Sequence, residues 1–197
     1  MNERMKQLFD FALEIDKEKS IFRQTHLSGC GRNENDAEHA WHMAIMAYLF
    51  REYSNEPIDI AKTMLMCLIH DVVEIDAGDT YCYDEEMKKS QKEREERAKE
   101  RIFSLLPPDF KKELSGIFEE FEEGKTPEAR FAHACDNMQP LMLNYSNDGF
   151  DWKAHPGQVN SKKVYERHSA TKAGSEQLFA VADEMLKEQI RKGNLSE

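Results

Sequence analysis

The sequence predicts an all-α protein. Apolar residues recur with a period near 3.6 in most segments, Gly and Pro mark the breaks between segments, and no two segments alternate like a β-hairpin. Hydrophobic residues make up 40% and charged residues 33% of the chain, which allows a globular core. A length of 197 residues fits one domain.

The first half of the chain is expected to contain three helices. Residues 3–16 carry a broad apolar stripe, and a loop rich in Gly and Asn follows. Asp36 is expected to cap a helix of about 18 residues. Pro57 and Asp59 open the next helix, which we expect Gly78 to end.

Residues 84–101 are strongly charged, and three interpretations compete for them. We favour an exposed helix with ion pairs between residues four apart. A disordered lid and a partner-binding helix remain alternatives.

The second half is also expected to be helical. Pro107 separates the charged segment from an amphipathic one, and Thr126 precedes a helix with an apolar face. Residues 147–157 read as a long loop. Helix is expected again over 160–191, with a break near Gly174.

Charge and composition exclude several classes of protein. The net charge of −11 disfavours a broad nucleic-acid-binding surface, although a small anion held by local cations remains compatible with it. No apolar run reaches the length of about 18 residues that a membrane span needs, and the N-terminus does not read as a secretory signal. We therefore expect a cytoplasmic protein with reduced cysteines.

Polar residues interrupt the apolar faces of three predicted helices. These residues are His39, the pair His70 and Asp71, and Asp136. Burying such groups is costly unless a partner neutralises them, and one divalent cation would neutralise both carboxylates and use both imidazoles. Because His70 and Asp71 are adjacent, they can share an ion only if it lies at a seam between helices.

Two imidazoles and two carboxylates form a mixed nitrogen and oxygen set. This set suits Mn, Co, Fe, Ni or Zn better than Ca, and Mg is also compatible with it. Four protein ligands around a six-coordinate ion leave positions for water and a substrate oxygen, as hydrolytic metal sites require.

The order of these residues resembles the HD-domain metal-dependent phosphohydrolase superfamily. The stretch R-N-E-N-D-A-E-H-A-W-H, followed by H-D-V-V-E-I-D-A-G-D and a later Asp, is similar to the 5′-deoxyribonucleotidase subfamily. The resemblance covers most of residues 1–190. It implies a single HD-domain bundle of about six to nine helices over residues 1–192, a tail over 193–197, and a nucleotidase acting on (deoxy)nucleoside 5′-monophosphates.

The resemblance also implies roles for individual residues. One divalent metal ion per chain would be held by His39, His70, Asp71 and Asp136. Glu74 and Asp79 would act at the reaction centre, and an arginine before the first histidine would bind phosphate. Arg23 and Arg32 both qualify; we favour Arg23 for phosphate and Arg32 for loop structure. In the bacterial enzymes a tryptophan follows the clamp arginine, and Gln24 stands there in this chain.

Helical spacing places Glu74 on the same face as the His-Asp pair. It can therefore serve as a general acid or base at a metal-bound water, or orient a ligand histidine. His42 and His133 share faces with predicted ligands, but we interpret both as supporting residues and not as a second metal site.

Other functions use the same residue types. An HD-domain nucleotide phosphodiesterase or pyrophosphohydrolase would need the same metal set, and a non-catalytic nucleotide-binding module could retain it. The Glu-x-x-His motif of ferritin-like bundles and the H-E-x-x-H motif of zincins are absent. From the resemblance we expect a homodimer, with the C-terminal helices as its interface.

Overall fold

The computed structural model describes residues 1–155 and 157–196. Its helices in the first half are α1 (Glu3–Glu14), α2 (Asp36–Phe50), α3 (Ile60–Ile69) and α4 (Glu74–Ala77), with 3₁₀ turns η1 (Ile15–Ser20) and η2 (Arg51–Tyr53). Those in the second half are α5 (Glu85–Phe103), α6 (Pro108–Glu123), α7 (Pro127–Ser146), α8 (Phe150–Ala154), α9 (Ser161–Gly174) and α10 (Glu176–Arg191). The prediction of an all-α fold is confirmed.

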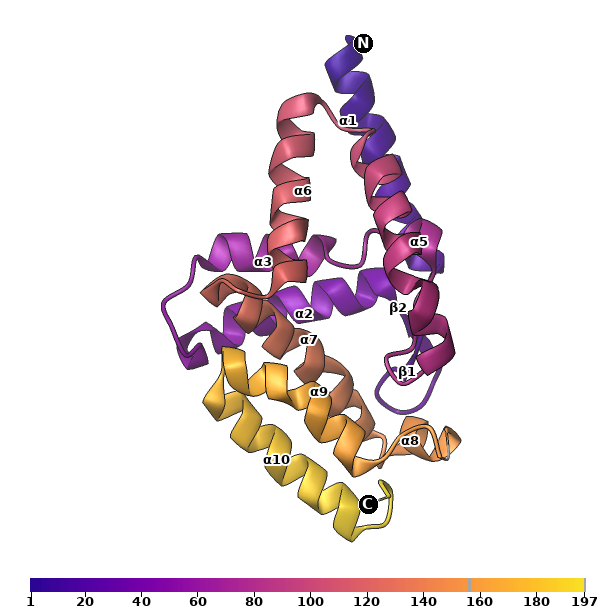
Figure 1. Ribbon diagram of the computed structural model, residues 1–197, viewed down its shortest axis with the longest axis vertical. Coiled ribbons are helices and arrows are strands. Elements are labelled where there is room, and N and C mark those ends of the chain that lie inside the picture. Colours follow the sequence, from indigo (N-terminus) through magenta and orange to yellow (C-terminus); the bar gives the residue numbers. More distant parts are fainter. Residues whose placement is uncertain (156, 197) are drawn as a thin grey trace.

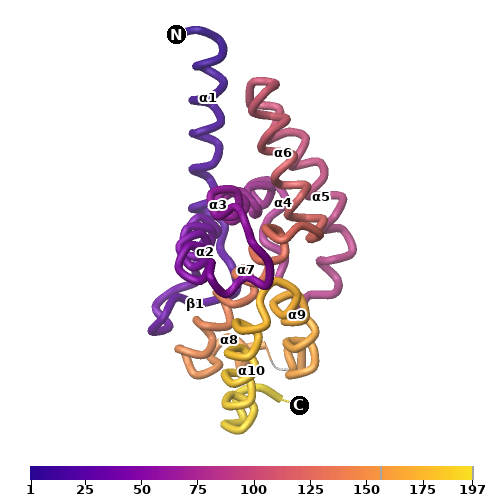
Figure 2. Tube along the Cα trace, turned by 90° about the vertical axis from the view of Figure 1, so that its left-hand side faces the viewer, coloured from indigo at the N-terminus to yellow at the C-terminus, as the bar shows by residue number. Residues whose placement is uncertain are grey.

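The helices form two regions around α7 (Figure 1). Helices α2 and α3 contact each other and α7 at the centre, while α9 and α10 cover the other side of α7. Helices α1, α5 and α6 rise together above this centre, as the side view also shows (Figure 2). Eight of the helices in the described residues have ten or more residues, and α4 and α8 are single turns.

The core has two parts. Side chains of α2, α3, α7, α9 and α10 form the larger cluster, including Met43, Met66 and Phe131, which are fully buried. A smaller cluster under α5 and α6 includes Ile102 and Phe103. In the described part of the chain, no helix combines the length and apolar composition needed to cross a bilayer.

A two-stranded antiparallel sheet replaces part of the predicted loop before α2. Strand β1 (Phe22–His26) pairs with β2 (Asn33–Asn35), with Phe22 opposite Asn35. The strands read F-R-Q-T-H and N-E-N, so the apolar alternation that would reveal them is missing. Polar side chains help to hold the two strands together: Asn33 Nδ2 on β2 donates to the Arg23 carbonyl on β1 at 2.7 Å.

The start of α2 differs by one residue from the prediction. Asn35 is the N-cap, and with Glu38 it forms a reciprocal capping box. Asp36 is the first helical residue, and its side chain is fully buried. Asn and Asp have similar capping preferences, so the local sequence did not distinguish them.

The charged segment is an ordered helix, α5, as we favoured. One ion pair joins residues four apart, Glu93 and Arg97, as expected, and others join residues three apart, such as Glu86 with Lys89. Its inner face packs Ala98 and Ile102 into the smaller core cluster. One face of α5 is therefore part of the packed core, and the alternative of a disordered lid is wrong.

The helix boundaries near the C-terminus follow the predicted breaks. Gly174 ends α9, and α10 begins at Glu176. A Cβ at position 174 would collide with the carbonyl group of Arg130 on α7, so glycine allows this close approach of α9 to α7. Pro156, inside the predicted long loop, lies outside the described residues.

Candidate metal centre and active site

Four predicted ligands lie together where α2, α3 and α7 meet. His39 comes from α2, Asp136 from α7, and His70 with Asp71 from the bend after α3. His39 Nε2 lies 3.1 Å from Asp136 Oδ1 and 4.0 Å from Asp71 Oδ2. His70 Nε2 lies 3.0 Å from Asp71 Oδ2 and 3.9 Å from Asp136 Oδ1. We call these four residues the His-Asp quartet.

The chain bends at the His-Asp pair, and this bend allows the two neighbours to face one centre. Helix α3 ends at Ile69, and α4 begins only at Glu74. Between them the backbone makes tighter bonds to residues three positions back, such as Glu74 N to Asp71 O at 2.8 Å. The sequence predicts a continuous helix as far as Gly78, in which adjacent side chains would diverge, and the bend makes that prediction wrong.

Both imidazole rings are oriented by hydrogen bonds on the side away from the quartet. His70 Nδ1 donates to the Cys67 carbonyl at 2.9 Å. His39 Nδ1 lies 2.9 Å from Gln139 Oε1, and Gln139 Nε2 in turn donates to Glu34 Oε1 at 2.6 Å. These partners leave each Nε2 atom facing the quartet, which is the arrangement of a metal-bound histidine.

The donor set fits a divalent metal ion. His39 and His70 are buried, and one ligand atom each from His39, His70 and Asp136 lie within 4.8 Å of one another. Among the described residues the buried His70 Nε2 has no hydrogen-bond partner, although Asp71 is close to it. A cation between the ligands would satisfy this nitrogen and offset the two carboxylates.

The charges around the quartet favour a bound cation. Burial lowers the pKa of His70, but the adjacent Asp71 carboxylate outweighs it and raises that pKa to about 9. Burial raises the pKa of Asp36 to about 7, and the Asp71 charge adds to this effect. The pKa of Glu74 is raised well above its ordinary value by burial and by the same carboxylate.

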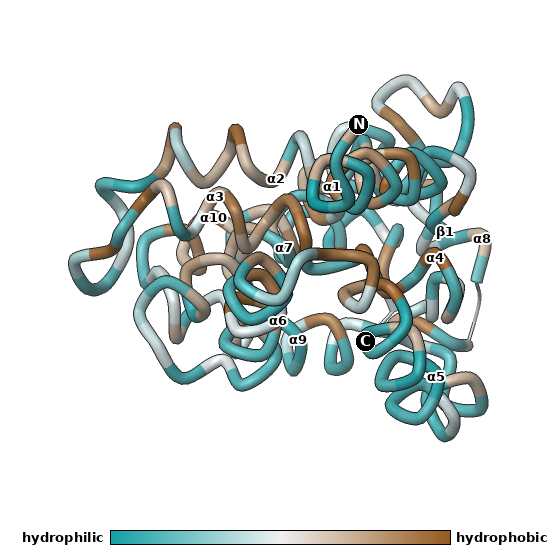
Figure 3. Tube along the Cα trace, turned by 90° about the horizontal axis from the view of Figure 1, so that it is seen from above, coloured by the Kyte–Doolittle hydropathy of each residue, from teal (hydrophilic) through white to brown (hydrophobic). Residues whose placement is uncertain are grey.

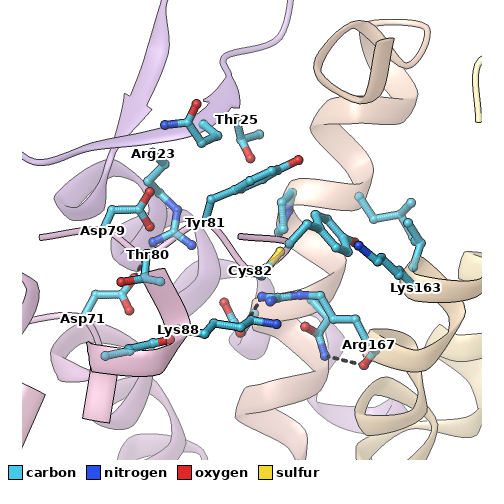
Figure 4. Close-up of a pocket in the computed structure, with 18 of the residues that line it drawn as sticks. Arg23, Thr25, Asp71, Asp79, Thr80, Tyr81, Cys82, Lys88, Lys163 and Arg167 are labelled. Carbon is cyan, nitrogen blue, oxygen red and sulfur yellow. Dashed lines mark hydrogen bonds and ion pairs between the residues drawn. The ribbon is translucent and has the colours of Figure 1, made fainter. Parts of the chain in front are cut away.

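A cavity of about 490 Å³ opens beside the quartet. Its volume lies in the range of small-molecule binding sites. Arg23, Glu74 and Asp79 line it together with His70, Asp71 and Asp136. The remaining wall includes Tyr81, Cys82 and residues of α5 and α9 (Figure 4).

The two predicted phosphate-binding arginines lie in different places. Arg23 on β1 reaches the quartet, with Nη1 donating to Asp71 Oδ2 at 2.6 Å and to Asp36 Oδ1 at 3.3 Å. Arg32 is exposed and donates to Glu38 Oε2 at 2.8 Å, outside the cavity. Arg32 therefore contacts the capping glutamate of α2, and its loop role stays a prediction.

Asp79 is placed by the turn that ends α4. Gly78 there has a φ of 74°, a conformation that side-chain-bearing residues rarely adopt. Arg94 of α5 holds the following residue by donating to Thr80 Oγ1 at 2.7 Å. Burial raises the pKa of Asp79, while the Arg23 charge opposes that shift.

The two other histidines near the quartet bind protein groups. His42 Nδ1 lies 3.1 Å from Gln139 Nε2. His133 Nε2 lies 2.8 Å from the Phe121 carbonyl oxygen, to which it can donate. These contacts agree with the supporting role expected from their positions.

Sequence reasoning missed several residues of the site. The sequence predicts only a capping role for Asp36, and no local pattern singles out Glu34 or Gln139. Arg167 and Lys163 of α9 also line the cavity. Their spacing of four residues places two cations on one helix face, and this was the available signal.

Comparison with known proteins identifies the family. Residues 15–179 match the family model described as HD domain. The chain belongs to the HD domain family. The match covers the His-Asp quartet and most of the helices around it, and it confirms the resemblance to HD-domain phosphohydrolases.

Solved structures agree with this assignment. A crystal structure described as a predicted metal-dependent phosphohydrolase from Magnetospirillum magnetotacticum MS-1 is 45% identical, with a TM-score of 0.93. That comparison covers 98% of this HD domain chain and 96% of the other. An HD-domain phosphohydrolase from Listeria innocua is 16% identical, with a TM-score of 0.66 over 95% of this chain and 92% of its own, and shares the fold.

Curated relatives are similar over a shorter region. The human 5′-deoxynucleotidase HDDC2 is 30% identical over 128 residues, which is 65% of this HD domain chain and 60% of the human protein. The mouse protein of the same name is 30% identical over 126 residues, 64% of this chain and 61% of its own length. The alignments thus span about 60% of these relatives.

Proposed function

We propose that this HD domain is a metal-dependent phosphohydrolase that releases phosphate from (deoxy)nucleoside 5′-monophosphates. The observation that carries the proposal is the His-Asp quartet at one end of a cavity that also contains Arg23, Glu74 and Asp79. The name of the human and mouse relatives, 5′-deoxynucleotidase, supports this substrate class.

The proposal includes one divalent metal ion per chain, held by His39, His70, Asp71 and Asp136. The mixed nitrogen and oxygen donors favour Mn, Co, Fe, Ni or Zn, with Mg as a further candidate. Such an ion, when bound, lowers the pKa of a water ligand and polarises a phosphoryl oxygen. Elemental analysis of the purified protein is expected to give one equivalent of metal per chain.

Arg23 binds the phosphoryl group in this proposal. Its contacts to Asp71 and Asp36 both use Nη1, which leaves donors on Nη2 and Nε for the substrate. A guanidinium can bind two phosphate oxygens at once, which orients the group and offsets the nearby carboxylates.

Glu74 and Asp79 manage the protons of the reaction. Glu74 is buried beside Asp71 and Asp36, so its carboxyl retains a proton that it can donate to the leaving oxygen. Asp79 faces the same cavity. Its carboxylate can accept a proton, or a hydrogen bond from a substrate hydroxyl.

A substrate panel tests the proposal. Purified protein loaded with each candidate metal is incubated with mono-, cyclic- and polyphosphorylated nucleotides, and phosphate release is measured. Release from 5′-monophosphates is the expected result. Activity confined to cyclic or polyphosphorylated nucleotides indicates a different HD-domain hydrolase, and nucleotide binding without any turnover indicates the non-catalytic module.

Replacing Arg23 tests the phosphate-binding role. Arg23→Gln is expected to raise KM at least about tenfold, because a charge-assisted hydrogen bond to phosphate is lost. Arg32→Gln removes the same charge outside the cavity and is the matched control, with KM expected within about twofold of the wild type. Equal effects of the two substitutions on KM would contradict the assignment.

We also propose a homodimer, with the exposed face of α2 as its interface. Trp41 and Leu49 on this face are 63% and 58% exposed, and Figure 3 shows α2 with apolar stretches at one edge of the molecule. Among the described residues of α9 and α10, the only exposed large apolar side chain is Val181, at 43%. A twofold dimer would place two copies of one such face together.

Trp41→Glu is expected to convert the dimer to a monomer, because a charge would be buried in the apolar interface. Light scattering after size-exclusion chromatography measures the mass. Val181→Glu introduces the same charge on α10 and should leave the mass unchanged. A monomeric wild type, or dissociation caused only by Val181→Glu, would refute this interface.

The predicted domain boundaries and compartment stay predictions. Within the predicted tail 193–197, Leu195 is buried in the larger core cluster, and Ser196 O accepts a hydrogen bond from Ser161 N at 2.7 Å. Glu197 lies outside the described residues. We therefore propose that the folded unit extends to Ser196.

A further inference from the structure

Arg167 is a second arginine at the cavity, and the proposed mechanism leaves it without a role. It belongs to α9, its side chain is 28% exposed, and its guanidinium points into the cavity (Figure 4). Nη2 lies 3.3 Å from Asp136 Oδ2. Across residues 1–155 and 157–196 its side chain makes no other hydrogen bond, so most of its five N–H donors are available.

The two arginines flank the His-Asp quartet. Arg23 contacts Asp71 from β1, while Arg167 contacts Asp136 from α9. Their charges act on a common space, because both arginines lower the pKa of Asp79 against the raising effect of its burial. Figure 4 shows the two side chains entering this space from separate elements.

The contact between Arg167 and Asp136 is not the geometry of a dedicated ion pair. Arg4 and Asp109, also in this chain, form two parallel hydrogen bonds of 2.7 Å each. Arg167 makes a single longer contact, and the other oxygen of Asp136 is turned to His39. A guanidinium optimised only to hold Asp136 would be expected to use the two-bonded form.

An anionic ligand needs more than one cation here. Carboxylates of Asp71, Asp79 and Asp136 line the cavity, and they repel a phosphate. Arg23 is already shared between Asp71 and Asp36. Arg167 supplies positive charge beside Asp136, with which Arg23 forms no ion pair in the described part of the chain.

We infer that Arg167 is a phosphate-binding residue that holds the phosphoryl group from the side opposite Arg23. The inference rests on the proposed phosphomonoester substrate. A phosphoryl group has three terminal oxygens, so two guanidiniums can bind it while an oxygen remains for the quartet. The site is thereby selective for a terminal phosphate, since a bridging diester has fewer terminal oxygens to offer.

Binding of inorganic phosphate to the Mn²⁺-loaded protein tests this role by calorimetry. Arg167→Gln keeps a donor for Asp136 but loses the charge, and phosphate affinity is expected to fall at least about tenfold. Arg167→Lys keeps the charge without the planar fork and should show a smaller loss. Lys162→Gln, an exposed position on the same helix, should bind phosphate like the wild type.

The Mn²⁺ affinity of each variant separates binding from positioning. We expect Arg167→Gln to retain it within about twofold, because none of the ligands changes. A loss of Mn²⁺ affinity with unchanged phosphate affinity would show that Arg167 only positions Asp136, and would overturn the inference. So would a wild-type protein that does not bind phosphate. The measurement needs no turnover, so failure to hydrolyse nucleotides remains a separate result.

Discussion

Asp136→Asn is expected to lower phosphate release by about 10³-fold or more, with loss of bound metal. Asp136 Oδ1 lies 3.1 Å from His39 Nε2 and 3.9 Å from His70 Nε2, so it joins the ligands of α2 and α3 to α7. An amide is a weaker metal ligand and leaves one negative charge fewer in the quartet. A loss of several kcal/mol of transition-state stabilisation corresponds to about three decades in rate.

The control for Asp136→Asn is Asp109→Asn. Asp109 carries an exposed carboxylate that pairs with Arg4, far from the cavity lining. Metal content by elemental analysis and initial rates with a 5′-monophosphate are measured on both variants. Full metal content and wild-type activity in Asp136→Asn would remove the foundation of the proposed metal centre.

Glu74→Gln is expected to reduce kcat by about 10²- to 10⁴-fold while the metal is retained. This range is typical of the loss of a general acid or base. Glutamine has nearly the same shape as glutamate but cannot donate the proton that we assign to Glu74. Because Glu74 is predicted not to be a ligand, elemental analysis should find wild-type metal content.

The stability of Glu74→Gln distinguishes a functional from a structural role. In the metal-free protein, the free energy of unfolding of the variant is expected to exceed that of the wild type by about 1 kcal/mol. The substitution removes an acid that is buried beside Asp71 and Asp36 and has an unpartnered Oε2 among the described residues. Stability at the expense of activity is the expected behaviour of an active-site acid.

Glu96→Gln is the control for Glu74→Gln. Glu96→Gln changes an exposed residue of α5 that pairs with Lys99, and it should alter neither kcat nor thermal unfolding. If Glu74→Gln lowered metal content in proportion to activity, Glu74 would be a ligand or would orient one. That result would favour the alternative role predicted from the sequence, in which Glu74 orients a ligand histidine.

The helices of the site could be predicted from the sequence because their signals are local. Apolar residues in α2, α3 and α7 repeat with helical period, and His39 and Asp136 interrupt these faces. A buried charge needs a partner, so the interruptions together indicated a cation. Thr126, with Pro127 after it, likewise marked the start of α7 through an N-cap signal.

The errors lie where tertiary contacts outweigh local preference. The β1–β2 pair has polar strands, so periodicity could not reveal it. The bend at His70 and Asp71 interrupts a segment whose composition is helical throughout. Asn35 and not Asp36 caps α2, and the Asp36 side chain is instead buried with its Oδ1 3.3 Å from Arg23 Nη1.

The sequence alone determined most of the helices and the type of chemistry: helices with apolar faces, interrupted by imidazoles and carboxylates whose burial a cation would make tolerable. Tertiary structure decided which groups share the cavity, bringing Arg23 from β1 to Asp71 and Arg167 from α9 to Asp136. The physical reason is the distance along the sequence over which each kind of interaction acts. Periodicity and capping act over a few residues, whereas the packing of α9 on α7 joins segments about thirty residues apart and leaves no periodic trace.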